Sequence, residues 1–252
     1  MKGKREKILS VALPIISLLC VLLIWTAAAL AVDNDYILPS FMGALEESGK
    51  LLGKKSFYTA LFNTLLRSAI AFLVSFMIAF LLALSERNLK YARYIVKPLV
   101  AVIRTLPTIA VVLLLLFWTS YDVAPVIVTM LVVLPTLYND IRNSLFSVDE
   151  KELEMCRVFG VSKRDVLFKV QIPQITPPML LTCGAGLALN LKLMVAAEVL
   201  SSTARSIGAM LSNAKYNVEI SQMIALVMIT VVIGLIIEGV FSLLSKKAGK
   251  FL

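Results

Sequence analysis

Residues 152–178 read ELEMCRVFGVSKRDVLFKVQIPQITPP, and they belong to the longest polar region of a chain that is otherwise mostly apolar. This polar segment carries charges of both signs, a glycine at position 160 and prolines at positions 173, 177 and 178. Glycine favours turns and proline interrupts regular helices. The residues therefore predict short helical elements rather than one continuous element.

The composition around the polar segment indicates a membrane protein. Of the 252 residues, 59% are hydrophobic and 16% are charged, which is far from the composition of an ordinary soluble domain. The sequence has no histidine, and its three cysteines are widely spaced without a CxxC pattern. These features argue against a disulfide framework, a zinc site and a Ser-His-Asp or Cys-His hydrolase.

Apolar runs predict an all-α membrane protein with six transmembrane helices, because a helix needs about 20 mostly apolar residues to cross the hydrocarbon core. The runs cover residues 8–32, 57–84, 98–118, 123–138, 179–200 and 220–244. The first run resembles a signal peptide, but its length favours a retained span. Pro107 is expected to break the third run, and the two prolines of the fourth predict a helix that is tilted, broken or tucked inside the bundle. We expect a single transmembrane domain over residues 1–252, with a short interfacial helix before the second span.

The distribution of basic residues predicts the orientation in the membrane. Of the 25 Lys and Arg residues, 17 fall on one set of loops, five on the other set, and three within the spans. Because cytoplasmic loops collect Lys and Arg, we expect both termini and the polar segment on the cytoplasmic side. The net charge of +9 is then explained without a nucleic-acid partner.

The polar segment and the residues just before it contain helix-capping patterns. Residues 147–152 hold two overlapping capping boxes, and Gly160 is expected to end the helix that follows in a left-handed conformation. Ser162 with Asp165 is expected to start a second helix, which the three prolines prevent from running smoothly into the fifth span. These patterns alone leave two interpretations open: a helix that docks on a cytoplasmic partner, and a solvated loop that connects two spans.

The same residues carry a resemblance to a known family. The polar segment resembles the EAA loop of ATP-binding-cassette (ABC) importer permeases, whose pattern is EAA, three residues, G, nine residues, then I-x-L-P. Glu154, Gly160 and Pro173 match this pattern at the family's spacing. The departures are small to medium apolar replacements at Met155, Cys156, Val170 and Ile172.

Further motifs extend the resemblance over about residues 36–245. The stretches Tyr36-Ile-Leu-Pro-Ser40, Asn63-Thr-Leu-Leu-Arg67, Val195-Ala-Ala-Glu198 and Ser206-Ile-Gly208 are similar to the nitrate/sulfonate/taurine branch of these permeases. The resemblance implies the type I ABC importer permease fold and a path for a small polar, anionic solute. A vitamin precursor of pyrimidine or riboflavin type is the alternative solute within the same family.

The resemblance also implies partners and site residues. Family members use two permease subunits, two cytoplasmic ATPase subunits and an extracytoplasmic substrate-binding protein, in the bacterial inner membrane. The second permease subunit is expected to be an identical copy. The coupling loop, about residues 140–178, would contact the ATPase through a coupling helix. Its expected coupling residues are Glu154, Met155, Cys156, Arg157, Phe159, Gly160, Val170, Ile172 and Pro173.

The chain itself is not expected to be an enzyme or to bind a cofactor. A P-loop needs four residues between its two glycines, whereas the nearest string has five between Gly43 and Gly49 and lies on the outer side. ATP and Mg are therefore expected on the partner ATPase. A self-contained secondary transporter would show inverted repeats or a relay of acids and histidines, and an intramembrane enzyme would show a catalytic constellation. The sequence displays neither pattern.

Charged residues within the spans are candidates for the translocation path. Arg67, Arg104, Lys192 and Glu198 fall within or at the ends of spans, where a charge is costly and is expected to face a cavity or a partner. Three cations favour an anionic solute. The alternative interpretation is structural pairing, for instance of Lys192 with Glu198. Gly184 and Gly186 are expected to permit close helix packing in the fifth span.

Overall fold

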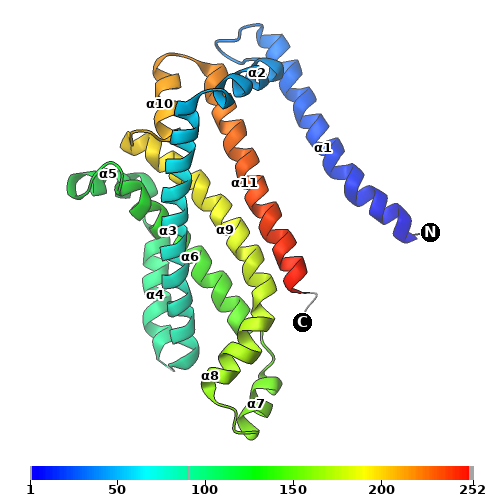
Figure 1. Ribbon diagram of the computed structural model, residues 1–252, viewed down its shortest axis with the longest axis vertical. Helices are drawn as coiled ribbons and strands as arrows, with labels where there is room; N and C mark the ends of the chain where they lie inside the picture. Colours follow the sequence, from blue (N-terminus) through cyan, green and yellow to red (C-terminus); the bar gives the residue numbers. More distant parts are fainter. Residues whose placement is uncertain (1, 90, 250–252) are drawn as a thin grey trace. The chain divides into compact units, whose positions relative to one another are not determined.

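The computed structural model describes residues 2–89 and 91–249, and all regular structure in this part of the chain is helical. In chain order the elements are α1 (Lys2–Val32), α2 (Phe41–Leu52), α3 (Lys55–Asn88), α4 (Ala92–Thr105), α5 (Thr108–Trp118), α6 (Ala124–Phe146), α7 (Glu150–Val158), α8 (Lys163–Asp165), the π-helical stretch η1 (Val166–Gln171), α9 (Ile172–Ser201), α10 (Ile207–Tyr216) and α11 (Ile220–Ala248). Figure 1 shows these elements along the chain. The all-α prediction is confirmed.

The described residues form two compact units. The first contains the chain up to Tyr58 together with Met210–Ile229, and the second contains Thr59–Ala209 and the chain from Thr230 onward. Within the first unit, Trp25 Nε1 of α1 donates a hydrogen bond to the carbonyl of Pro39, 3.1 Å away, just before α2 begins. Its ring also contacts Phe41 edge-on, with ring centroids 5.7 Å apart. α2 lies where a short interfacial helix was predicted, and it begins where Ser40 caps the amide of Gly43.

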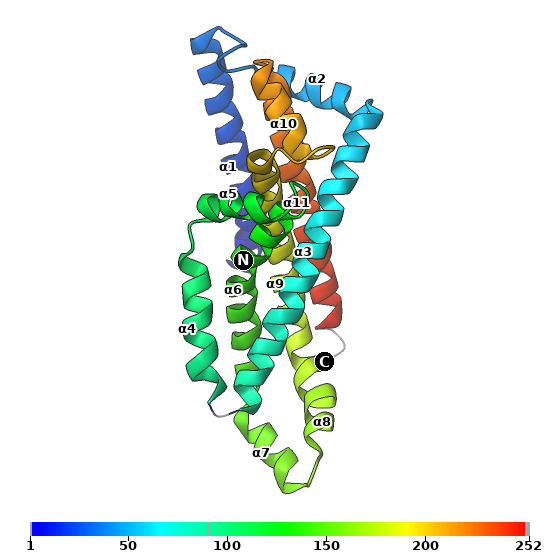
Figure 2. The same ribbon diagram turned by 90° about the vertical axis from the view of Figure 1, so that its left-hand side faces the viewer.

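The core of the second unit lies around α6 and α9, which pack side by side in both views (Figures 1 and 2). α4 and α5 pack on α6, and α5 also contacts α9. Buried residues of this core come from α3, α4, α6, α9 and the start of the coupling loop: Ala79, Ala83, Val96, Val100, Leu137, Tyr138, Ile141, Leu145, Val148, Leu153 and Ile175. α6 is therefore the central helix of the unit, tucked inside the bundle.

Two glycines of α9 allow close helix packing, as expected. A β-carbon at Gly184 would lie 2.7 Å from the β-carbon of Phe241 on α11. A β-carbon at Gly186 would lie 3.0 Å from Leu137 of α6 and 3.2 Å from Phe72 of α3. Small residues let helix backbones approach where lipid supplies no hydrophobic drive. These contacts hold α9 between three other helices of the unit.

The predicted spans can be compared with the helices. α3, α6, the continuous helical stretch 163–201 and α11 are each long and apolar enough to cross a membrane. The third predicted run is broken, because α4 and α5 meet at an angle of 92° around Pro107. Figure 2 shows the bend between the two helices. Pro107 was expected to break this run, and that prediction is confirmed. α1 covers the whole of the first predicted run.

Two boundary predictions were wrong. α6 does not end near Tyr138 but continues to Phe146. The prolines after α8 do not separate it from the fifth span, because helical structure is continuous over residues 163–201. The backbone passes through η1 just before Pro173, and this wider turn accommodates a residue that cannot donate a backbone hydrogen bond.

Candidate functional site

A buried carboxylate organises the C-terminal end of α9. Glu198 is fully buried, yet each carboxylate oxygen has a partner. Thr64 Oγ1 of α3 lies 3.1 and 2.8 Å from its two oxygens, and the backbone amide of Gly208 donates to Oε2 over 3.3 Å. Arg67 Nη1 supplies the neutralising charge at 3.2 Å from Oε1. A buried charge is tolerated only when it is paired and hydrogen-bonded in this way.

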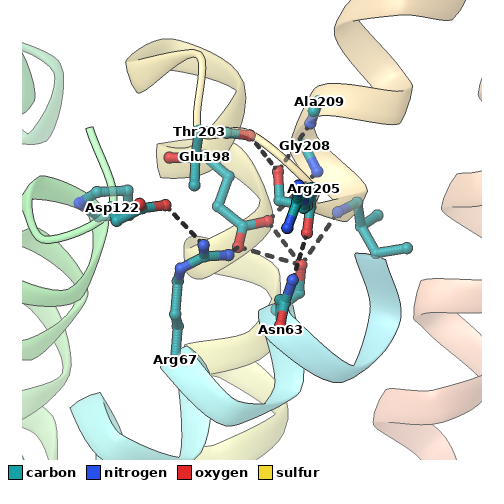
Figure 3. A network of polar contacts seen from close by, with 12 residues as sticks. Asn63, Arg67, Asp122, Glu198, Thr203, Arg205, Gly208 and Ala209 are labelled. Atoms are coloured by element: carbon teal, nitrogen blue, oxygen red, sulfur yellow. Dashed lines mark hydrogen bonds and ion pairs between the residues drawn. The ribbon is translucent and has the colours of Figure 1, made fainter. Parts of the chain in front are cut away.

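Arg67 joins this carboxylate to a second one. Its Nη2 lies 2.6 Å from Oδ1 of Asp122, in the turn between α5 and α6. The Arg67 side chain is 16% exposed, whereas that of Asp122 is 63% exposed. One guanidinium therefore links α3, α9 and the α5–α6 turn, as Figure 3 shows.

Backbone groups of the loop after α9 complete the network. The amide of Ile207 donates to Thr64 Oγ1 over 3.0 Å, and Asn63 Nδ2 donates to the carbonyl of Arg205 over 3.0 Å. Thr203 Oγ1 donates to the carbonyl of Tyr121 over 2.6 Å. These bonds fix residues 202–207 against α3 and against the α5–α6 turn. The loop cannot move without breaking polar contacts to two other elements.

The translocation-path candidates separate into two groups. Arg67 and Glu198 lie together in this network, and both terminal nitrogens of Arg67 are occupied by carboxylates. Arg104, in the last turn of α4, and Lys192, in α9, are both exposed and lie outside the network. The suggested pairing of Lys192 with Glu198 is wrong, because Glu198 pairs with Arg67. The geometry favours structural pairing for Arg67 and Glu198, and the path role of all four residues stays a prediction.

The coupling loop forms two short helices joined by a tight turn. Asp149 caps α7 by accepting the amide of Lys151 over 3.0 Å. At the other end, Gly160 has φ +67°. The amide of Gly160 donates to the carbonyl of Arg157, and the amide of Val161 donates to the carbonyl of Cys156. This is a Schellman motif, which needs a residue in the left-handed conformation. The predicted glycine turn is confirmed.

The second helix begins as its sequence predicts. Ser162 Oγ accepts the amide of Asp165 over 3.1 Å and donates to its carboxylate over 2.8 Å. Across the loop, Gln174 Nε2 of α9 donates to Glu152 of α7 over 2.6 Å. α7 is therefore held at a defined position relative to the start of α9, at one end of the second unit (Figure 1).

The predicted coupling residues differ in exposure. Leu153 is the buried residue of α7, so the opposite face of the helix points outward. Most of the expected residues of α7 and the turn are exposed: Glu154, Met155, Arg157, Phe159 and Gly160. Those that are half-buried are Cys156, Val170, Ile172 and Pro173. Phe159 is 77% and Val158 84% exposed, which is an unusual apolar surface on an otherwise charged helix.

Comparison with known proteins identifies the family. The sequence model of the family described as "Binding-protein-dependent transport system inner membrane component" matches residues 75–250. The chain belongs to this family. The recognition of an ABC importer permease, made from the coupling-loop motif, is confirmed.

Curated relatives of the permease are transport proteins. It is 25% identical over 233 residues to the putative aliphatic sulfonates transport permease protein SsuC of Bacillus subtilis, covering 92% of this chain and 84% of the relative. It is 23% identical over 220 residues to the taurine transport system permease protein TauC of Escherichia coli, covering 85% of this chain and 80% of the relative. A putative ABC transporter permease protein of Methanocaldococcus jannaschii is 25% identical over 238 residues, covering 92% and 86%.

Solved structures show the same fold. The permease resembles a chain from a crystal structure of an amino acid ABC transporter with a TM-score of 0.65 and 19% identity, covering 76% of this chain and 94% of the other. It resembles the methionine transporter MetNI in an inward-facing form with a TM-score of 0.62 and 15% identity, covering 76% and 93%. The type I importer permease fold is confirmed, and the permease is a multi-pass membrane protein.

Several residues of the site were not found from the sequence. Thr64, Asp122 and Gly208 are polar or small residues at sequence distances from Glu198 that no local pattern covers. The nearest signals were the stretches Asn63-Thr-Leu-Leu-Arg67 and Ser206-Ile-Gly208, noted only as family motifs. Among the residues that the structure describes, no cluster of acidic and cysteine side chains is suited to hold a metal ion.

Proposed function

We propose that the permease carries a small anionic solute, of the sulfonate or taurine kind, through a path driven by ATP hydrolysis on separate ATPase subunits that dock on α7. The relatives whose names specify a solute transport aliphatic sulfonates and taurine. The exposed cations Arg104 and Lys192, which lie outside the Glu198 network, agree with an anionic solute. Nitrate belongs to the same class of solute, and a vitamin precursor of pyrimidine or riboflavin type is the alternative.

The exposed face of α7 supports docking rather than a solvated connection. The helix is capped at both ends, anchored through Leu153 and bonded to α9 through Glu152, while Met155, Val158 and Phe159 stay exposed. A solvated loop has no need for exposed apolar side chains on a rigid support. A short helix with an apolar surface is suited to a groove on a cytoplasmic protein.

The proposed assembly contains two copies of the permease, two ATPase subunits and an extracytoplasmic substrate-binding protein. ATP and Mg would bind the ATPase, and the permease would bind no cofactor. We place the assembly in the bacterial inner membrane, surrounded by lipid, with both permease termini in the cytoplasm. Ser245 Oγ near the end of α11 donates to the carbonyl of Pro177 over 2.7 Å, which supports a C-terminus on the side of the coupling loop.

Replacement of Glu154 tests the docking face. The permease is co-expressed with its ATPase, and the amount of ATPase that co-purifies in detergent is measured for wild type, Glu154→Lys and Glu219→Lys. Glu219 is also exposed but precedes α11 on the opposite predicted side of the membrane. We expect Glu154→Lys to lose the ATPase while Glu219→Lys retains it. Equal recovery of the ATPase in all three samples would contradict docking on α7.

Replacement of Gly160 tests the turn that positions α7. Because Gly160 has φ +67°, Val at this position is strained although nothing lies within 4 Å of its β-carbon. We expect Gly160→Val to reduce uptake per ATP hydrolysed while the protein still inserts in the membrane. Gly160→Asn is the control, because Asn tolerates the left-handed conformation. Equal uptake per ATP hydrolysed in the Val and Asn variants would contradict the role of the turn.

A further inference from the structure

A second buried carboxylate lies where α3, α4 and α6 converge, near the start of the coupling loop. Glu86 of α3 has a side chain that is 1% exposed. Its Oε2 accepts hydrogen bonds from Tyr138 Oη and Arg142 Nε of α6, and each donor–acceptor distance is 2.6 Å. Its Oε1 lies 3.7 Å from Nε of Arg93 on α4. We call Glu86, Tyr138 and Arg142 the Glu86 joint.

A neighbouring contact ties α3 to the last turn of α6. Arg87 Nη1 donates to the carbonyl of Leu145. The guanidinium carbons of Arg87 and Arg142 lie 5.6 and 4.7 Å from the ring centroid of Phe146. The C-terminal end of α6 is therefore attached to α3 by one hydrogen bond and one cation–π contact, both from Arg87, while the Arg142 contact lies within α6.

Only three residues separate this attachment from the coupling helix. α6 ends at Phe146 and α7 begins at Glu150. Val148 between them and Leu153 of α7 are buried in the same hydrophobic cluster as Leu145. Glu150 is also close enough to act electrostatically on Arg87. Because of these contacts, α7 can move little unless the end of α6 moves with it.

Apolar contacts alone would not fix this connection as strictly. Apolar side chains slide past one another at small cost, because dispersion and hydrophobic contacts have no preferred direction. A buried ion pair is different, since removing either partner from hydrogen-bond distance leaves an uncompensated charge. The Glu86 joint therefore resists sliding of α3 against α6. It lies near the end of α6, where a displacement of α7 would be transmitted to the membrane helices.

We propose that the Glu86 joint makes α3, α6 and α7 one rigid body, so that ATPase-driven displacement of α7 moves the membrane helices instead of only the loop. This inference rests on the proposed function, because it assumes an ATPase docked on α7. Glu86, Tyr138 and Arg142 are positioning residues that contact neither solute nor ATP. The joint is distinct from the docking face, which lies on the exposed side of α7.

The test measures solute taken up per ATP hydrolysed by the full transporter in proteoliposomes. Glu86→Gln keeps the shape of the side chain and removes the charge that pairs with Arg142. We expect assembly and ATP hydrolysis to persist, while uptake per ATP falls at least about tenfold, the lower end of what losing a charge-assisted hydrogen bond costs. Asp140→Asn is the matched control, because Asp140 is half-buried on α6 outside the joint, and it should leave the ratio unchanged.

Two further variants separate positioning from folding. Tyr138→Phe removes one hydroxyl from the joint, so a several-fold lower ratio is expected even if Glu86→Gln fails to assemble. A double variant that combines Glu86→Gln with Arg142→Gln should show the same uptake per ATP hydrolysed as Glu86→Gln alone, because both changes break the same pair. An unchanged ratio in Tyr138→Phe, or uptake and hydrolysis that fall together in proportion to assembled protein, would overturn the proposal. Absence of ATP-driven uptake in wild type would instead overturn the proposed function.

Discussion

Replacement of Gly208 by alanine tests the network around Glu198 most sharply. An alanine β-carbon at this position would lie 2.7 Å from the carbonyl carbon of Glu198 and 2.7 Å from the amide nitrogen of Val199, and closer still to the Glu198 β-carbon. These atoms belong to the α9 backbone or are fixed to it, so no rotamer change relieves the conflict. The start of α10 must move away from α9, which lengthens the hydrogen bond from the Gly208 amide that already spans 3.3 Å.

The size of the effect follows from these two consequences. Overpacking costs about 1–3 kcal/mol, and a hydrogen bond to a charged group is worth about 1.5–3 kcal/mol. Together they lower the free energy of unfolding by about 2.5–6 kcal/mol. For a chain of this size, each kcal/mol shifts Tm by about 2–4 °C, so Tm should fall by about 5–24 °C.

The assay is thermal unfolding of the purified permease in one detergent, followed by loss of monodisperse protein. Gly239→Ala in α11 is the matched control, because nothing lies within 4 Å of a β-carbon at that position. That variant should melt at or slightly above the temperature of wild type, since alanine favours helix. If Gly208→Ala melts within about 2 °C of wild type, the close packing of Gly208 on Glu198 is refuted.

Three further predictions concern the same unit. Thr64→Val removes the hydroxyl between Glu198 and a buried amide, so Tm should fall by an amount equivalent to about 2–4 kcal/mol; a Tm equal to that of wild type would count against the network. Gly184→Val places side-chain atoms against α11, where a β-carbon already lies 2.7 Å from its neighbour, and should lower Tm more than Gly184→Ala does. Lys192→Gln should raise KM for an anionic solute without lowering Tm, whereas Arg67→Gln should lower Tm; the reverse pattern would contradict the division of these cations into path and structural groups.

Local patterns in the sequence predicted the coupling loop well. Asp149, Gly160 and Ser162 act within four residues of their own positions, through caps and a left-handed turn. Such short-range bonds depend on residue type and spacing, which the sequence displays directly. The resemblance to the EAA loop added the partner and the function, which caps alone left open.

Long-range polar contacts explain what the sequence did not predict. Polar residues after Tyr138 indicated the end of a span, but Arg142 continues the helix because it pairs with Glu86 on α3. Thr64 and Glu198 are 134 residues apart, and no periodicity connects them. The sequence showed that Glu198 needs a partner, and only the fold shows which one.

ATP-driven uptake in a reconstituted system tests the central claim most directly. Proteoliposomes containing the permease and its ATPase are supplied with the substrate-binding protein and a labelled sulfonate or taurine on one side and ATP on the other. The account predicts uptake only when the ATPase, ATP and the binding protein are all present, and loss of uptake when any one is omitted. Uptake by the permease alone, without ATPase or ATP, would contradict the account and would indicate a self-contained transporter.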